Sequence, residues 1–406
     1  MAREMKNSGV QWIGERTSNW NTIQLKRHSH VVSGKEVKVE LEPEDENAVP
    51  VYGSGGVFKY TDREQYNGEV VMFGRKGTIG KPLYVNDSFW AVDTMYFLIH
   101  ERAYLFPKFN YYQLSAFNWE LYTTQTALPS IVASQILDSK FPFPPLSEQK
   151  SIADFLDAKC GEIDGLLADL DAEVKTLTEY KKSIIAETVT RGLNPNAPMK
   201  SSGILWAESI PAHWGVEKFR YKLKPKKIVG QGDKEVLSVY REYGVVIKSS
   251  RDDNHNRTSE DTSNYKYVQP NDFVINKMKA WQGSMGVSNY EGIVSPAYFV
   301  YSFRDEDYLP KFFHYYMRNA NNIPEYRRLS GGIREGQWDL SPYDLGNMPI
   351  ILPPIDEQIE IANYLDSKCA AIDQAITDKT QQIETLKAYK SSLIYEYVTG
   401  KKQVAL

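Results

Sequence analysis

The sequence has little cysteine, no long apolar run and none of the motifs of common cofactor sites. Two cysteines among 406 residues argue against a disulfide framework, and neither belongs to a CxxC zinc or redox pair. No stretch of about 18 apolar residues is present to span a membrane, and the N-terminus lacks the apolar core of a signal peptide. We therefore expect a cytoplasmic chain without disulfides, membrane spans or a metal site.

A strong net charge is also absent, because the formal net charge is −4 at pH 7. Whole-chain charge therefore gives no general attraction to nucleic acid, and any DNA contact must come from a local patch. GRKGT at Gly74 lacks the GxxxxGK[ST] spacing of a phosphate loop, and neither a glycine-rich cofactor loop nor an NPPY-type base pocket occurs. We predict no catalytic residues and no cofactor in this chain.

The most informative feature that is present is a long internal repeat. PPLSEQKSIADFLDAKCGEIDGLL, from Pro144, aligns without gaps with PPIDEQIEIANYLDSKCAAIDQAI, from Pro353, at an offset of 209 residues. A second pair, KNSGVQWIGERTSNW from Lys6 and KSSGILWAESIPAHW from Lys200, aligns at an offset of 194. The chain is thus a tandem duplication with similar ends and variable middles. Its length fits this interpretation at about 100 to 200 residues per domain.

Each proline-rich repeat entry is expected to open a long amphipathic helix, at 147–191 and 355–400, with Ser147 as the N-cap of the first. Apolar residues recur at heptad spacing, which predicts that the two helices bury their seams against each other as an antiparallel coiled coil. At about 1.5 Å per residue, each helix would be roughly 64 Å long. The predicted packing residues are Leu156, Ile163, Leu167, Leu170, Val174, Leu177 and Ile184 in the first helix and Leu365, Ile372, Ile376, Ile383, Leu386 and Leu393 in the second.

The regions before the helices have the mixed patterns of α/β domains. GEVVMFGRKGTIGKPLYVND is typical of strand, tight turn and strand, and DFVINKMKAW and GIVSPAYFVYSF are further strand candidates. We expect an α+β fold with two mixed domains in pseudo-two-fold tandem, separated by the antiparallel helices. The expected parts are a first domain at 1–146, a central helix at 147–191, a linker at 192–199, a second domain at 200–354 and a C-terminal helix at 355–400.

These repeats carry a resemblance to a known family. The PPLSEQ and PPIDEQ entries, the SGVQWIG and SGILWAE starts, and GRKGTIGKPLYV, INKMKAWQGSMGVS and GIVSPAYFVYS resemble the DNA-specificity subunit of type I restriction-modification enzymes over essentially the whole chain. The resemblance implies a non-catalytic subunit of a host-defence system. Each target-recognition domain would read one half of an asymmetric bipartite site on double-stranded DNA, and the helices would fix the spacer.

The same resemblance implies the partners of the chain. Two methyltransferase subunits that use S-adenosylmethionine would dock on it, and two restriction subunits, which are translocase-nucleases using ATP and Mg, would join through the complex.

Candidate DNA contacts lie on polar turns, each with a solvated loop or strand face as its alternative interpretation. Period-two alternation would place Lys277 and Lys279 on one strand face, where they could reach phosphate or guanine. Arginines flank the Gly331–Gly332 turn, and the run from Lys218 to Lys227 is the densest basic cluster. The candidates are Arg75, Lys76, Thr78, Thr124 and Gln125 in the first domain and Lys222, Lys224, Lys277, Lys279, Gln282, Arg327, Arg328 and Arg334 in the second. Trp12, Trp20, Trp206 and Trp214 are expected in cores.

Two other functions stay open on the sequence. A stand-alone DNA methyltransferase or nuclease is disfavoured by the missing motifs, and methyl transfer or DNA cleavage by the purified chain would support it. A coiled-coil adaptor that binds no DNA is the other alternative, and the lack of any sequence preference among duplexes would eliminate the specificity role.

Overall fold

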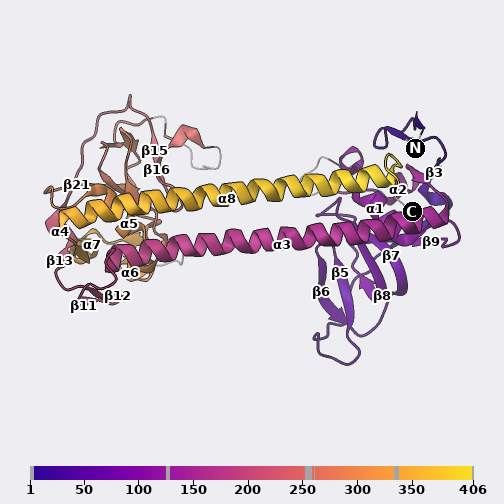
Figure 1. The fold of residues 1–406 in the computed structure, drawn as a ribbon, viewed down its shortest axis with the longest axis horizontal. Coiled ribbons are helices and arrows are strands. Elements are labelled where there is room, and N and C mark those ends of the chain that lie inside the picture. Colours follow the sequence, from indigo (N-terminus) through magenta and orange to yellow (C-terminus); the bar gives the residue numbers. More distant parts are fainter. Residues whose placement is uncertain (1–3, 125–128, 252–257, 260, 333–337, 405–406) are drawn as a thin grey trace. The chain divides into compact units, whose positions relative to one another are not determined.

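The computed structural model describes residues 4–124, 129–251, 258–259, 261–332 and 338–404. Its contacts divide the chain into two compact units, whose elements are labelled in Figure 1. Unit 1 comprises Met1–Asp171 and Thr380–Leu406, and unit 2 comprises Ala172–Lys379. Each unit therefore combines one globular region with the first part of the long helix that follows it and the last part of the other long helix.

The globular region of unit 1 is built on a six-stranded sheet with strand order β4-β9-β7-β8-β5-β6. Only the β5–β8 pair is parallel. Its elements are β1 (Met5–Asn7), β2 (Glu15–Thr17), β3 (Asn21–Gln24), η1 (Leu25–Arg27), β4 (Ser29–Ser33), β5 (Val49–Gly53), β6 (Gly56–Thr61), β7 (Tyr66–Gly74), β8 (Leu83–Ala91), β9 (Met95–His100), α1 (Pro107–Ser115), η2 (Trp119–Tyr122), α2 (Ala133–Asp138) and β10 (Lys140–Phe143).

Strand β7 organises this sheet, because consecutive side chains of a strand point to opposite faces. Val71 and Phe73 belong to the core cluster that also holds residues of α1 and of the long helices. Val70 and Met72 belong to a separate cluster on the other face. The predicted strand, turn and strand are confirmed as the antiparallel pair β7 and β8.

The globular region of unit 2 has a smaller main sheet, of four strands in the order β14-β21-β18-β19, together with two-stranded sheets. Its elements are β11 (Met199–Ile204), β12 (Ala207–Pro211), β13 (Gly215–Lys218), α4 (Phe219–Lys222), β14 (Leu223–Pro225), β15 (Leu237–Tyr240), β16 (Gly244–Ile247), η3 (Lys248–Ser250), β17 (Lys266–Val268), β18 (Phe273–Asn276), η4 (Ala280–Gln282), β19 (Met285–Val287), β20 (Gly292–Val294), β21 (Tyr298–Phe303), α5 (Pro310–Arg318), η5 (Ala320–Asn322), α6 (Ile323–Arg328), β22 (Ser330–Gly331), β23 (Asp339–Leu340), α7 (Pro342–Asn347) and β24 (Pro349–Leu352).

The long helices are α3 (Leu146–Arg191) and α8 (Ile355–Val398). Because α3 already includes Leu146, Ser147 lies inside the first turn and the prediction that it is the N-cap is wrong. Pro145 precedes the helix instead, and its carbonyl accepts a hydrogen bond from the Gln149 N–H at 3.0 Å.

Within each unit, the helix segments pack antiparallel, as predicted (Figure 1). In unit 1, Phe155 packs on Tyr397 and Asp164 pairs with Lys390 at 2.6 Å, so residue numbers fall along α8 as they rise along α3. In unit 2, Lys379 pairs with Glu173 and Lys181 with Asp373, in the same sense. Lys181, Lys379 and Lys390 thus form ion pairs between the two helix segments.

The seam residues predicted from the heptads are all buried or half-buried. Those that are buried are Leu156, Ile163, Ile184, Leu365, Ile372, Ile383 and Leu393, and those that are half-buried are Leu167, Leu170, Val174, Leu177, Ile376 and Leu386. Cys160 and Cys369 are buried free thiols.

The same set of hydrogen bonds fastens each globular region to the start of its long helix. The indole N–H of Trp20 donates to Glu148 at 3.0 Å, and that of Trp214 donates to Glu357 at 2.9 Å. The core position predicted for these two tryptophans and for Trp12 is confirmed, and Trp206 is half-buried. The first turn of each repeated helix is therefore half of a repeated junction.

A buried glutamine completes each junction. In unit 1, the Gln149 amide accepts from the Phe106 N–H at 2.8 Å and donates to the carbonyls of Tyr104 and Pro144, both at 2.9 Å. In unit 2, the Gln358 amide makes the same bonds to Leu309, Asp307 and Pro353 at 2.7, 2.8 and 2.9 Å. The EQ dipeptide of the repeat is thus explained by its two hydrogen-bonding roles.

Candidate functional site

In unit 1, a polar turn follows the central strand β7. The turn folds back so closely that a Cβ on Gly74 would lie 2.3 Å from the carbonyl oxygen of Thr78, which explains the glycine. Arg75, Lys76 and Thr78 are exposed on this turn. The Arg75 guanidinium lies 5.7 Å from the centre of the Tyr96 ring, an arrangement that favours a cation–π contact. The turn thus presents two cations and a hydroxyl to solvent.

The second predicted segment of unit 1 is joined to this turn by backbone contacts. The Ile131 N–H donates to the Arg75 carbonyl at 3.1 Å, and Lys76 forms an antiparallel bridge with Ser130. The Thr124 N–H donates in turn to the Ser130 carbonyl at 3.0 Å. The structure therefore brings Thr124 beside the turn, whereas Gln125 lies outside the described residues.

In unit 2, the corresponding turn follows β18. The prediction that Lys277 and Lys279 share one face of a strand is wrong. Strand β18 ends at Asn276, and the Asn276 carbonyl accepts a hydrogen bond from the Lys279 N–H at 3.0 Å. Lys277 and Lys279 are therefore in a turn, to which the two-residue alternation of a strand does not apply. Lys277 pairs with Asp339 at 3.0 Å, and Lys279 is exposed.

The turns of the two units are held by the same hydrogen bond. In unit 2, the Leu340 N–H donates to the Lys277 carbonyl at 3.1 Å, as the Ile131 N–H does to the Arg75 carbonyl in unit 1. Leu340 and Ile131 are equivalent in the repeat. We call each arrangement a turn–loop surface: residues 75–78, 124 and 129–131 in unit 1, and residues 277–282, 327–332 and 338–340 in unit 2.

The arginines of the turn–loop surface in unit 2 differ in their surroundings. The Arg327 guanidinium lies 5.7 Å from the Trp281 ring centre, and Gln282, which follows Trp281 in the chain, is half-buried. Arg328 donates two hydrogen bonds to Glu325, at 2.8 and 2.6 Å, so one edge of its guanidinium is already engaged. Arg334 lies outside the described residues.

Two predicted contacts of the basic run in unit 2, Lys222 and Lys224, lie away from this surface. Lys224 on β14 pairs with Ser302 of β21, whereas Asn276, which precedes the turn, pairs with Tyr298 at the other end of β21. Lys222 pairs with Asp307 at 2.5 Å, and its side chain is 13% exposed. Of these two predicted contacts, only Lys224 is exposed.

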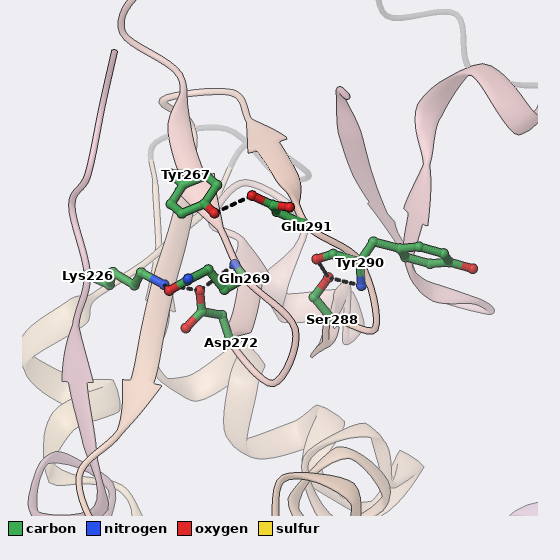
Figure 2. Close-up of polar contacts among 7 residues, drawn as sticks. All are labelled: Lys226, Tyr267, Gln269, Asp272, Ser288, Tyr290 and Glu291. Carbon is green, nitrogen blue, oxygen red and sulfur yellow. Dashed lines mark hydrogen bonds and ion pairs between the residues drawn. The ribbon is translucent and has the colours of Figure 1, made fainter. Parts of the chain in front are cut away.

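A third lysine of the run is part of a buried network, shown in Figure 2. Lys226 pairs with the buried Asp272 and donates to the Gln269 side chain at 2.8 Å. The Gln269 N–H donates to the same Asp272 carboxylate at 2.7 Å. Lys226 therefore stabilises the bend before β18, although sequence alone grouped it with the possible phosphate contacts.

Sequence reasoning missed the aromatic pair that supports the surface of unit 2. Trp281 and Trp338 have ring centres 5.4 Å apart and meet edge to face. The available signal was their position next to Lys279 and Asp339. In the described part of the chain, no three His, Cys, Asp or Glu side chains are grouped to hold a metal ion. No helix there is long and apolar enough to cross a membrane.

The chain is thus an internally duplicated protein, in which each unit has a turn–loop surface and segments of both long helices. Comparison with known sequences identifies its family. The chain belongs to the family described as type I restriction modification DNA specificity domain, which matches residues 17–175 and 227–385.

Individual relatives agree with this assignment. The chain is 26% identical over 286 residues to a putative type I restriction enzyme MjaX specificity subunit of Methanocaldococcus jannaschii, covering 68% of this chain and 62% of that protein. It is 25% identical over 299 residues to the type I restriction enzyme MjaVIII specificity subunit of the same organism, covering 70% and 66%. The matches thus span 62% and 66% of the lengths of these relatives.

A solved structure shares the fold. A chain of the structure titled "Structural basis underlying complex assembly and conformational transition of the type I R-M system" superposes with a TM-score of 0.64. It is 14% identical, and the match covers 95% of this chain and 99% of that one.

Proposed function

We propose that this chain is the non-catalytic DNA-specificity subunit of a type I restriction-modification complex. Its target-recognition domains, at 1–146 and 200–354, each read one half of an asymmetric bipartite site on double-stranded DNA. The observation that supports this most is the repeated turn–loop surface, held by equivalent hydrogen bonds to the Arg75 and Lys277 carbonyls. Both surfaces present cations from a turn of fixed backbone, which is what groove recognition requires.

We assign different tasks to the residues of these surfaces. Arg75 is exposed and its guanidinium has a planar donor fork, so it suits a bidentate contact to a guanine edge. Lys76 and Lys279 suit phosphate contacts, because an ammonium group is a point charge. Thr78, Thr124 and Gln282 provide neutral polar groups beside them. Lys224, remote from the turn, is at most a phosphate contact.

We assign the spacer to the long helices. A helix of 46 residues, such as α3, is about 69 Å long at about 1.5 Å per residue. The helices set the separation of the half-sites and dock two methyltransferase subunits, which bind S-adenosylmethionine. Two restriction subunits that use ATP and Mg join the complex, which acts on DNA in the cytoplasm.

The decisive experiment is selection from a random duplex library by the full chain together with its methyltransferase partner. Two short half-sites at a fixed spacer are expected. Recovery of no preferred sequence would identify a coiled-coil adaptor, and methyl transfer or cleavage by the purified chain alone would identify a stand-alone enzyme. Arg75→Ala should relax only one of the two half-sites.

The spacer role has its own test, which is deletion of one heptad from each helix at 169–175 and 378–384. These segments are equivalent in the repeat and contain both members of the Lys379–Glu173 pair. The Lys390–Asp164 and Lys181–Asp373 pairs remain to fix the register. Each helix loses about 10 Å, so the selected spacer should shorten by about 3 base pairs. An unchanged spacer would contradict the assignment.

A further inference from the structure

One exposed apolar side chain stands at the centre of the turn–loop surface of unit 2. Met278 is 48% exposed and lies between Lys277 and Lys279. The equivalent hydrogen bonds to the Arg75 and Lys277 carbonyls make Lys76 the counterpart of Met278. The chemical character of this position therefore differs between the two surfaces: unit 1 has a cation and unit 2 has a thioether.

The backbone around Met278 is held firmly. The indole N–H of Trp281 donates to the Met278 carbonyl at 3.2 Å. The Lys279 N–H donates to Asn276, and the Gln282 N–H donates to the Lys279 carbonyl at 3.1 Å. Hydrogen bonds thus close the turn on both sides of the methionine. The loop is therefore already ordered before a ligand binds.

Trp281 is in turn fixed by its neighbours. The Trp338 ring meets it edge to face at 5.4 Å, and the Arg327 guanidinium lies 5.7 Å from its ring centre. Asp339, next to Trp338, pairs with Lys277 at 3.0 Å. The side chain of Met278 therefore projects from a supported base, and cations lie on both sides of it in the sequence.

This setting fits DNA better than a protein partner. Single exposed apolar residues are common on protein surfaces, so exposure alone carries no meaning. Two lysines beside Met278 would have to be desolvated in an apolar protein interface, whereas on DNA they can face phosphates. The major groove offers one apolar group for a side chain between them, the 5-methyl group of thymine. Methionine suits that contact because its thioether is flexible and polarizable.

We propose that Met278 is a specificity-determining residue that contacts the 5-methyl group of a thymine in the half-site read by unit 2. Trp281 is a positioning residue that holds the Met278 carbonyl. This inference rests on the proposed function, because it assumes that unit 2 reads double-stranded DNA.

The test removes the thymine methyl group and the Met278 thioether in turn. Each thymine of the library-selected duplex is replaced by deoxyuridine, which lacks only the 5-methyl group, and binding is measured with the full chain and its methyltransferase partner. At one position in one half-site, deoxyuridine should weaken binding by the wild-type chain about fourfold, the change expected for one buried methyl group. Met278→Ala should bind the thymine and deoxyuridine duplexes alike, and Met278→Leu should restore the difference.

Two further variants separate positioning from charge. Trp281→Phe keeps an aromatic ring, although a smaller one, and deletes the N–H donor, so the thymine preference should shrink while the other half-site is read as before. Lys279→Ala should weaken binding equally on both duplexes and reduce the salt dependence. An undiminished thymine preference in Met278→Ala, or no sensitive thymine at all, would overturn the inference while a selected sequence upheld the proposed function. Failure to select any sequence would instead refute the proposed function.

Discussion

The two units are most alike where the globular region meets its helix and least alike where each presents its turn. At the junctions, Trp20 and Trp214 bind Glu148 and Glu357 at 3.0 and 2.9 Å, and buried glutamines repeat one another bond for bond. The main sheets, in contrast, have six strands in unit 1 and four in unit 2. The junction is thus a constant part that tolerates different sheets behind it.

The turn–loop surfaces show the same division on a smaller scale. The backbone bond that anchors each turn is preserved, at 3.1 Å in both units. The side chains on it differ, since Arg75 lies over Tyr96 and Lys277 is paired with Asp339. A common backbone frame therefore supports unlike chemistry, which is what the proposed reading of two different half-sites requires.

The largest expected effect tests the equivalence of the junctions. Gln149→Ala and Gln358→Ala each leave three backbone groups without partners, so each should lower the free energy of unfolding of its own unit by about 3 kcal/mol. Hydrogen exchange followed by mass spectrometry on peptides of each unit measures this. Gln374→Ala, at an exposed position of α8, is the matched control and should change little. If one variant increased hydrogen exchange equally in both units, the conclusion that each junction stabilises its own unit would be wrong.

Acid stability offers the next test, since each unit has a histidine ring shielded from water: His100 is buried and His314 is partly buried. Burial, with His30 and Arg102 nearby, lowers the pKa of His100 to about 3, and burial, with Arg318 nearby, lowers the pKa of His314 to about 3. The nearby Asp366 carboxylate acts in the opposite direction on the pKa of His314.

Between about pH 6.5 and these values the unfolded chain binds more protons, so stability should fall as the pH drops below about 6.5. The loss at pH 5 should be on the order of 2 kcal/mol for each histidine. Urea unfolding of the wild type, His100→Gln and His314→Gln across this range measures it, and each variant should flatten the acid slope by a similar amount. A wild-type stability that is flat from pH 7 to pH 5 would contradict the burial argument.

A third test asks whether the unlike turns act differently on DNA. Arg75→Ala should cost about 1 to 3 kcal/mol on its own half-site if the contact is bidentate. Lys279→Ala should weaken binding to the same extent on all sequences and lower the salt slope by about one, as loss of a phosphate contact does. Binding to duplexes with either half-site scrambled, at several salt concentrations, distinguishes the two patterns.

The smallest effect concerns the ion pairs of the helices. Double-mutant cycles on Lys390 with Asp164 and on Lys181 with Asp373 should each give about 0.5 kcal/mol, because these side chains remain partly exposed. The coupling should decrease with added salt. A coupling in one unit and none in the other would show that the register of the two helix segments is held differently.

The parts of the fold that sequence predicted depend on local periodicity. The heptads that include Leu156 and Leu365 predicted both long helices and their antiparallel packing, because a helical stripe is visible in the chain itself. Two apolar runs, one of them around Val71, and the glycine-rich turn between them predicted β7 and β8 in the same way. The type of these elements, and the faces by which the long helices pack, could therefore be predicted without a structure.

The site was less accessible because distant backbone groups shape it. The strand predicted through Lys279 stops at Asn276, since the Lys277 carbonyl is engaged by Leu340, far along the chain. Lys222 looked available until Asp307 was placed beside it, and the support that Trp338 gives to Trp281 has no local signature. Charge along the sequence indicates where cations are but not which anions already hold them.

The division of α8 between the units bears on the order in which they can fold during synthesis. Unit 2 is one continuous segment, Ala172–Lys379, and all of it has been made before the ribosome reaches the last turns of α8. Unit 1 needs those turns, because Leu393, Ile394 and Val398 share its core with Trp20, and the Tyr395 hydroxyl donates to the Ile13 carbonyl at 2.7 Å. The first region translated is therefore the last to be completed, and a premature stop near residue 380 damages the half of the protein that was synthesised first.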